Sequence, residues 1–127
     1  MDTNTYALVA PDGTLDFKTG VPSQMWEDAD PHYGAHAGFH ISLPTWPGGA
    51  RGIRGYIGDC SALDSQKYPP NTAAEHIVTA LGGPAQPWFG NVALCGSRMV
   101  GPELDLCGLT VEQQEHIRDL HAAAVNG

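Results

Sequence analysis

Three stretches of the chain decide its fold: Thr72-Ala73-Ala74-Glu75, Val92-Ala93-Leu94-Cys95 and Thr110-Val111-Glu112-Gln113. The first and third have the form Ser/Thr-x-x-Glu/Gln, in which a hydroxyl and a later side chain satisfy the unpaired N–H groups at a helix start. The second is a short apolar run, typical of a buried strand. They predict a helix over residues 72–82, a strand over 88–95 and a helix over 110–124.

Further strands are expected in the first half of the chain. Residues 5–10 form an apolar run that ends in the turn Pro11-Asp12-Gly13, so a hairpin returning through Leu15 and Phe17 is predicted. Residues 39–43 alternate between apolar and polar side chains, which predicts a half-buried strand. Residues 53–57 indicate another strand, interrupted by glycines. Residues 19–36 lack a clear period and are interpreted mainly as loop, with a short helical turn after Pro22-Ser23 as the alternative.

The whole chain of 127 residues is predicted to form a single domain, residues 1–127. Its fold class is α+β: a mainly antiparallel sheet of four to five strands, with the two helices on one face. No apolar run is long enough for a membrane helix, and Met1-Asp2-Thr3-Asn4 does not resemble a signal peptide, so the expected location is the cytoplasm. The three cysteines are Cys60, Cys95 and Cys107. Because they lack metal-type spacing, they are expected to be reduced thiols.

The net charge is −8, and the acidic residues concentrate near the two ends of the chain. Residues 1–33 hold six acids and one lysine, and residues 102–127 hold five acids and one arginine. Direct nucleic-acid binding is disfavoured, since that function relies on a basic surface. A partner with a basic surface fits this distribution, and so does the simpler interpretation that the acids keep the protein soluble.

Three of these segments carry a resemblance to a known family. The runs Pro69-Pro70-Asn71-Thr72-Ala73-Ala74, Pro87-Trp88-Phe89-Gly90-Asn91-Val92 and Leu109-Thr110-Val111-Glu112-Gln113 resemble an actinobacterial and actinophage family of small proteins known only as a domain of unknown function. The resemblance covers about residues 69–125, with weaker similarity over 6–17, and the segment 21–47 departs from the family pattern. It implies no cofactor and no catalytic residue. It does imply a setting, an accessory protein of a phage or mobile element.

Three histidines form the candidate metal site. His32, His36 and His40 recur at every fourth residue, which would align three imidazole rings on a helix. Gly34 and Gly38 weaken that helix, and the alternation around His40 places its ring in a strand, away from the loop histidines. The missing ligand of such a site would be Cys107 or an acid from Asp28-Asp30, since catalytic zinc usually has three protein ligands and an open fourth position. The favoured interpretation is that these histidines are solvated or hydrogen-bonded and bind no metal.

Two further motifs are candidates for chemistry. Cys60 is a possible nucleophile if a histidine such as His76 lies beside it, although an ordinary turn residue is favoured. The run from Gly48 to Arg54 places the guanidinium groups of Arg51 and Arg54 beside open backbone N–H groups, which suits a phosphate or carboxylate. A flexible hairpin loop is the alternative interpretation of that run.

The tryptophans are the candidate contact residues. Trp88 leads into the predicted strand and is expected in the core, whereas Trp46 lies in a loop between Pro44 and Pro47 and suits either a small satellite core or a partner contact. Ligand binding is therefore assigned to Trp46, Arg51 and Arg54.

The leading functional hypothesis is a non-catalytic accessory protein that binds a host protein, such as a defence or regulatory protein, with homodimerisation as a secondary expectation. The alternatives are a protein that binds or sequesters a small anionic ligand, and a metal- or thiol-dependent enzyme.

Overall fold

The computed structural model describes residues 4–30, 36–41, 52–58, 66–83, 86–100 and 102–126. In chain order the elements are β1 (Asn4–Val9), β2 (Leu15–Gly20), α1 (Pro22–Ala29), β3 (His36–Ile41), β4 (Gly52–Gly58), α2 (Thr72–Ala80), β5 (Val92–Val100), β6 (Glu103–Cys107) and α3 (Val111–Asn126). All strand pairs are antiparallel, in the order β2-β1-β5-β4-β3, and β6 pairs with β5. The predicted α+β class is confirmed.

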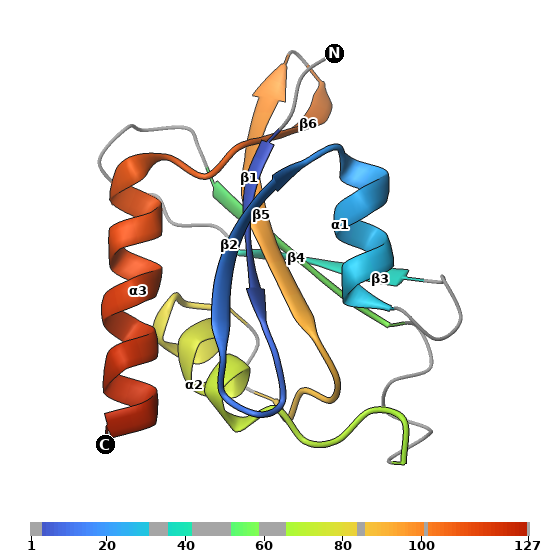
Figure 1. The fold of residues 1–127 in the computed structure, drawn as a ribbon. Coiled ribbons are helices and arrows are strands. Elements are labelled where there is room, and N and C mark those ends of the chain that lie inside the picture. The colour runs from blue at the N-terminus through green and yellow to red at the C-terminus, as the bar shows by residue number, and fades with distance from the viewer. Residues whose placement is uncertain are drawn as a thin grey trace.

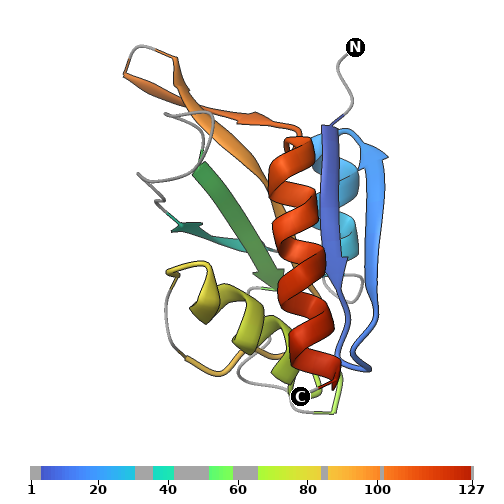
Figure 2. The ribbon, with the colours of Figure 1, turned by 90° about the vertical axis from the view of Figure 1, so that its left-hand side faces the viewer.

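The central strand is β5, whose length lets it pair with three others. Its first residues pair with β1, its middle with β4, and its last five, Gly96–Val100, with β6. Helices α2 and α3 cover one face of the sheet, and α1 lies against the other (Figures 1 and 2). Two helices on one face were expected, and α1 adds a third.

The main core lies between the sheet and the helices α2 and α3. Alternate residues of the strands face these helices: Ala7 and Val9 from β1, Val92 and Leu94 from β5. Ile77, Val78 and Ile117 meet them from the helices, and all three are fully buried. Apolar burial of this kind contributes most of the free energy of folding.

A second, smaller core lies between the sheet and α1. The strand side chains that point to this face pack against Met25 and Ala29 of α1; they are Tyr6, Tyr56, Ala93 and Cys95. The segment 19–36 was interpreted mainly as loop, and the structure corrects this, because residues 22–29 form an eight-residue helix with Pro22 in its first turn. Proline suits this position since its missing N–H would be unpaired there anyway.

The start of α2 differs from the prediction. Thr72 was expected to cap it, but the N-cap is Asn71, whose Oδ1 accepts the N–H of Ala74 at 3.0 Å. The helix ends at Ala80, two residues before the predicted end. Gly82 then adopts a φ of +92°, a left-handed conformation that glycine accepts without strain.

The start of α3 agrees with the prediction. Thr110 Oγ1 accepts the N–H of Gln113 at 3.1 Å, and Gln113 Oε1 accepts the N–H of Thr110 at 2.9 Å, which is the reciprocal capping box. Val111, the first residue of α3, is apolar but 65% exposed.

The strand predicted over 88–95 lies further along the chain. Regular pairing begins at Val92, because residues 88 and 90 are used to pair with the segment before α2 through Trp88 O and Gly90 N. The strand continues to Val100 and turns into β6, which was not predicted. Trp88 itself is 4% exposed, so its expected place in the core is confirmed.

Candidate functional site

The most unusual polar group on the α1 side of the sheet is the guanidinium of Arg54. Arg54 lies in the middle of β4 and pairs with His40 of β3 on one side and Cys95 of β5 on the other. Its Nε donates to the hydroxyl of Tyr56 at 3.1 Å, and its Cζ lies 5.4 Å from the centre of the Tyr56 ring. The cation is therefore held by an aromatic residue of its own strand.

The guanidinium extends over β3 at Gly38, the register partner of Tyr56. A Cβ atom built on Gly38 would lie 2.6 Å from Arg54 Nη2, so a side chain there would displace the guanidinium. The Trp26 ring of α1 also packs edge-on against the Tyr56 ring, at a centroid distance of 6.0 Å. Trp26, Tyr56 and Arg54 thus form one row across this face, which we call the Arg54 row.

Arg54 has no carboxylate partner among the residues whose placement is described. The ion pairs found there are Lys18–Asp28 at 3.4 Å and Arg98–Asp105 at 3.1 Å. Arg54 is only half-buried, and a guanidinium has five N–H donors, of which Tyr56 takes one. The remaining donors are suited to a planar oxyanion.

The positive charge of Arg54 acts on its neighbour Cys95. The pKa of the Cys95 thiol is raised to about 12, mainly by burial and in part by Cys107, while Arg54 opposes both by favouring the thiolate. Cys95 is therefore a protonated, buried thiol. A role as a nucleophile is disfavoured for it, since the thiolate is the reactive form.

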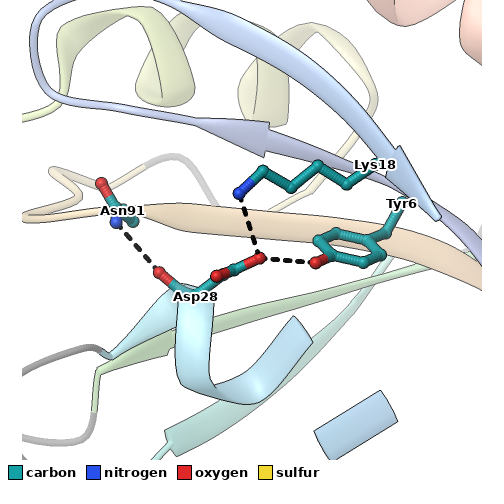
Figure 3. A network of polar contacts seen from close by, with 4 residues as sticks. All are labelled: Tyr6, Lys18, Asp28 and Asn91. Carbon is teal, nitrogen blue, oxygen red and sulfur yellow. Dashed lines mark hydrogen bonds and ion pairs between the residues drawn. The ribbon is translucent and has the colours of Figure 1, made fainter. Parts of the chain in front are cut away.

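A second polar group lies at the end of α1 and holds that helix on the sheet (Figure 3). Asp28 Oδ2 accepts the hydroxyl of Tyr6 at 2.5 Å and lies 3.4 Å from Lys18 Nζ. The backbone carbonyl of Asp28 accepts Nδ2 of Asn91 at 2.9 Å. Burial, and then the bond to Asp28, raise the pKa of Tyr6 well above its usual range, so Tyr6 remains a donor.

The neighbouring acid Asp30 is fully buried and accepts the hydroxyl of Tyr68 at 2.5 Å. Asp28 and Asp30 therefore join α1 to β1, β2 and the segment before α2. Sequence analysis considered this acidic pair only as a metal ligand. The alternation Tyr6/Leu8 in the first strand gave no sign that the Tyr6 hydroxyl meets an acid of α1.

The histidine candidates are only partly covered by the structure. His36 and His40 belong to β3 and pair with Gly58 and Arg54, so they lie on a strand and not on a common helix. The side chains of both, and the whole of His32, lie outside the described residues. Among the described residues no group of three or more histidine, cysteine or acidic side chains is placed to hold a metal ion.

Of the other candidate residues from the sequence, some lie within the described part of the chain and some lie outside it. Arg54 is placed by the structure, whereas Arg51, Trp46 and Cys60 lie outside the described residues. His76, the proposed partner of Cys60, is exposed on α2.

Comparisons with known proteins add no identification. No family model, no curated protein and no solved structure matches the chain. The resemblance to the actinobacterial and actinophage family therefore stays a prediction. None of the helices in the described part of the chain is both long and apolar enough to span a bilayer.

Proposed function

We propose that this protein is a non-catalytic binding domain that receives an anionic group at Arg54. The observation that supports the proposal is a half-buried guanidinium that no described carboxylate neutralises, in a chain with a net charge of −8. An arginine in an acidic protein ordinarily meets one of the many carboxylates available to it. Here the guanidinium is oriented by Tyr56 and Gly38 instead.

The expected ligand group is a carboxylate or a phosphate. A carboxylate is planar, and a tetrahedral phosphate presents two of its oxygens in a similar way, so each can bind the fork of a guanidinium through charge-assisted hydrogen bonds. The group would come either from a partner protein or from a small free anion. The first source corresponds to an accessory protein of a phage or mobile element that binds a host protein, and the genes that flank this one would test that setting.

The direct test is titration of the protein with inorganic phosphate and with acetate, followed by NMR of the arginine Nε–Hε groups. We expect the Arg54 signal to shift on titration. Arg54→Gln should weaken phosphate binding at least about tenfold, because one or two charge-assisted hydrogen bonds are lost. Arg98→Gln is the matched control, since Arg98 is exposed and already paired with Asp105 at 3.1 Å.

The outcomes separate the possible ligand sources. The anion site is supported if the Arg54 signal shifts in the wild type and in Arg98→Gln, and if Arg54→Gln weakens phosphate binding while Arg98→Gln leaves it unchanged. Equal weakening by both variants, or no shift at Arg54, contradicts it. If a host protein is the source, capture of that protein from lysate should depend on Arg54 in the same way and compete with added phosphate.

A further inference from the structure

The strand β2 forms one outer edge of the sheet. It is the first strand in the order β2-β1-β5-β4-β3, and within the described part of the chain its only partner is β1. Figure 2 shows β2 at the outer side of the molecule, with β1 on its inner side. Its sequence is Leu15-Asp16-Phe17-Lys18-Thr19-Gly20.

The hydrogen-bond pattern of the hairpin shows which backbone groups of β2 point outward. The N–H of Ala10 donates to the carbonyl of Thr14, so positions 10 and 14 form a hydrogen-bonded pair. Because such pairs alternate along an antiparallel ladder, the pairs Leu8/Asp16 and Tyr6/Lys18 are bonded as well. This leaves the N–H and carbonyl groups of Leu15, Phe17 and Thr19 directed away from β1.

The same alternation is visible on the other side of β1. The carbonyl of Thr5, register partner of Thr19, accepts the N–H of Leu109 and therefore points away from β2. The outward set of β2 is thus fixed by two independent bonds. Three residues offer six backbone groups to a further strand.

The side chains of β2 carry opposite charges on one face. Asp16 and Lys18 share the α1 side of the sheet with their register partners Leu8 and Tyr6, and both are exposed. Charged residues on an edge strand normally discourage pairing with another chain. In this strand, however, the two charges lie symmetrically about Phe17.

We propose that a second copy of this chain pairs with β2, antiparallel, about a twofold axis at Phe17. Phe17 then faces the Phe17 of the second copy in a hydrogen-bonded pair, and Leu15 faces Thr19 in the same kind of pair. Asp16 of each copy lies opposite Lys18 of the other in a non-hydrogen-bonded pair, where side chains are closest. The two sheets become one continuous sheet.

This register satisfies the outward backbone groups of β2, pairs its two charges and brings the Phe17 rings together. The backbone groups left free by β1 are those that a twofold pairing at Phe17 requires. On the α1 side two ion pairs form. On the opposite side two Phe17 rings meet, each covered by Arg118 of its own α3, whose Cζ lies 5.0 Å from the ring centre. A shift by one residue would direct the bonded groups away from each other, and a shift of the axis by two would lose the charge match.

The surface is separate from the Arg54 row. It lies on β2, at the opposite end of the strand order from β3 and β4. The proposal therefore does not depend on anion binding, and either can fail alone.

The test uses charge reversal in the whole 127-residue chain. Asp16→Lys places Lys opposite Lys, and Lys18→Asp places Asp opposite Asp, so each variant alone should raise the dissociation constant of the dimer at least about tenfold. An equimolar mixture of the two variants restores both ion pairs, so it should form a one-to-one heterodimer in native mass spectrometry. The double variant Asp16→Lys/Lys18→Asp should form homodimers again.

Two controls keep the result interpretable. Glu27→Lys is the control for Asp16→Lys, because it changes the net charge by the same amount and in the same direction at an exposed position of α1. It should leave the dimer intact. Far-UV circular dichroism verifies that each variant is folded, since Lys18 also pairs with Asp28. The proposal is overturned if the wild-type protein stays monomeric up to millimolar concentration, if Asp16→Lys still dimerises like the wild type, or if the mixed variants stay apart.

Discussion

Asn71 is 1% exposed, yet every polar atom of its side chain has a hydrogen-bond partner. Its Nδ2 donates to the carbonyl of Val9 at 2.9 Å and to that of Gly90 at 2.8 Å, while its Oδ1 caps α2. One amide thus joins the end of β1, the approach to β5 and the start of α2. Burial of a polar side chain is tolerated when it is fully bonded in this way.

Asn71→Asp should therefore destabilise the protein, although it preserves the capping oxygen. The carboxylate would turn an acceptor toward the carbonyls of Val9 and Gly90, so we expect the free energy of unfolding to fall by about 3 kcal/mol or more. Thr72→Ala is the matched control. Thr72 would be the cap according to the sequence motif, but it is exposed and should contribute less than about 0.5 kcal/mol. Urea unfolding measures both changes, and a larger effect of Thr72→Ala would contradict the assignment of the cap.

Sequence reasoning failed at this residue for a physical reason. The Ser/Thr-x-x-Glu pattern selects Thr72, but Asn71 is by itself an equally strong N-cap residue, even though Ala74 and not Glu75 then stands three residues later. The choice depended on the two carbonyls that hold the Asn71 amide, one of them 62 positions away along the chain. Where the capping interaction is local, as for Thr110 and Gln113, the prediction was correct.

At the scale of elements, α1 is the helix that the sequence showed least clearly. It is short, and Met25 and Ala29 alone give it a buried side. Its attachment relies instead on Asp28, which meets Tyr6, Lys18 and Asn91 from three separate segments. β6, in contrast, could have been predicted from the sequence. Leu104 and Leu106 alternate with acids after Gly101-Pro102, which is the pattern of a half-buried strand.

Asp28→Ala should loosen α1 while leaving the rest of the sheet in place. The variant removes the acceptor of the Tyr6 hydroxyl and the ion pair with Lys18, but keeps the carbonyl that Asn91 binds. We expect hydrogen exchange of residues 22–29 to accelerate at least about tenfold, with little change in β5 and α3. Glu27→Ala, an exposed neighbour, is the control. Equal acceleration across the whole chain would show that Asp28 stabilises the fold as a unit.

The Arg54 row shows the limit of sequence reasoning about the site. Arg54 was predicted to bind an anion from a local run of glycines and arginines. Its setting depends on Tyr56, Gly38 and Trp26, which come from three elements and carry no joint motif in the sequence. The alternation of side chains along a strand predicts that Arg54 and Tyr56 lie on one face. The residues that lie beside them on the neighbouring strands follow only from the strand register, which the sequence does not show.

For the whole molecule, the two raised pKa values predict a loss of stability in alkali. The native pKa of Cys95 is about 12, so above pH 9 the unfolded chain releases this proton while the folded chain retains it. Tyr6 behaves in the same way above about pH 10. The free energy of unfolding should therefore be unaffected by these groups near neutral pH and fall as the pH rises through this window.

Cys95→Ala removes the first of these contributions. The variant should be less stable than the wild type at pH 7, because a buried sulfur atom is lost, yet its stability should decline less between pH 8 and about pH 11. Urea midpoints measured across this range give the two slopes. Parallel slopes for the variant and the wild type would show that Cys95 does not take part.

The pairing of Ala7 with Leu94 has a consequence for folding during synthesis on the ribosome. The first hairpin is complete within twenty residues, but its inner strand finds its neighbour only after β5 has been synthesised. Until then one edge of the apolar strand β1 is unpaired, so chaperones or other nascent chains can bind it. Closing so long a stretch of chain is slow, so maturation is expected to take milliseconds to seconds and to begin only after β5 has been synthesised.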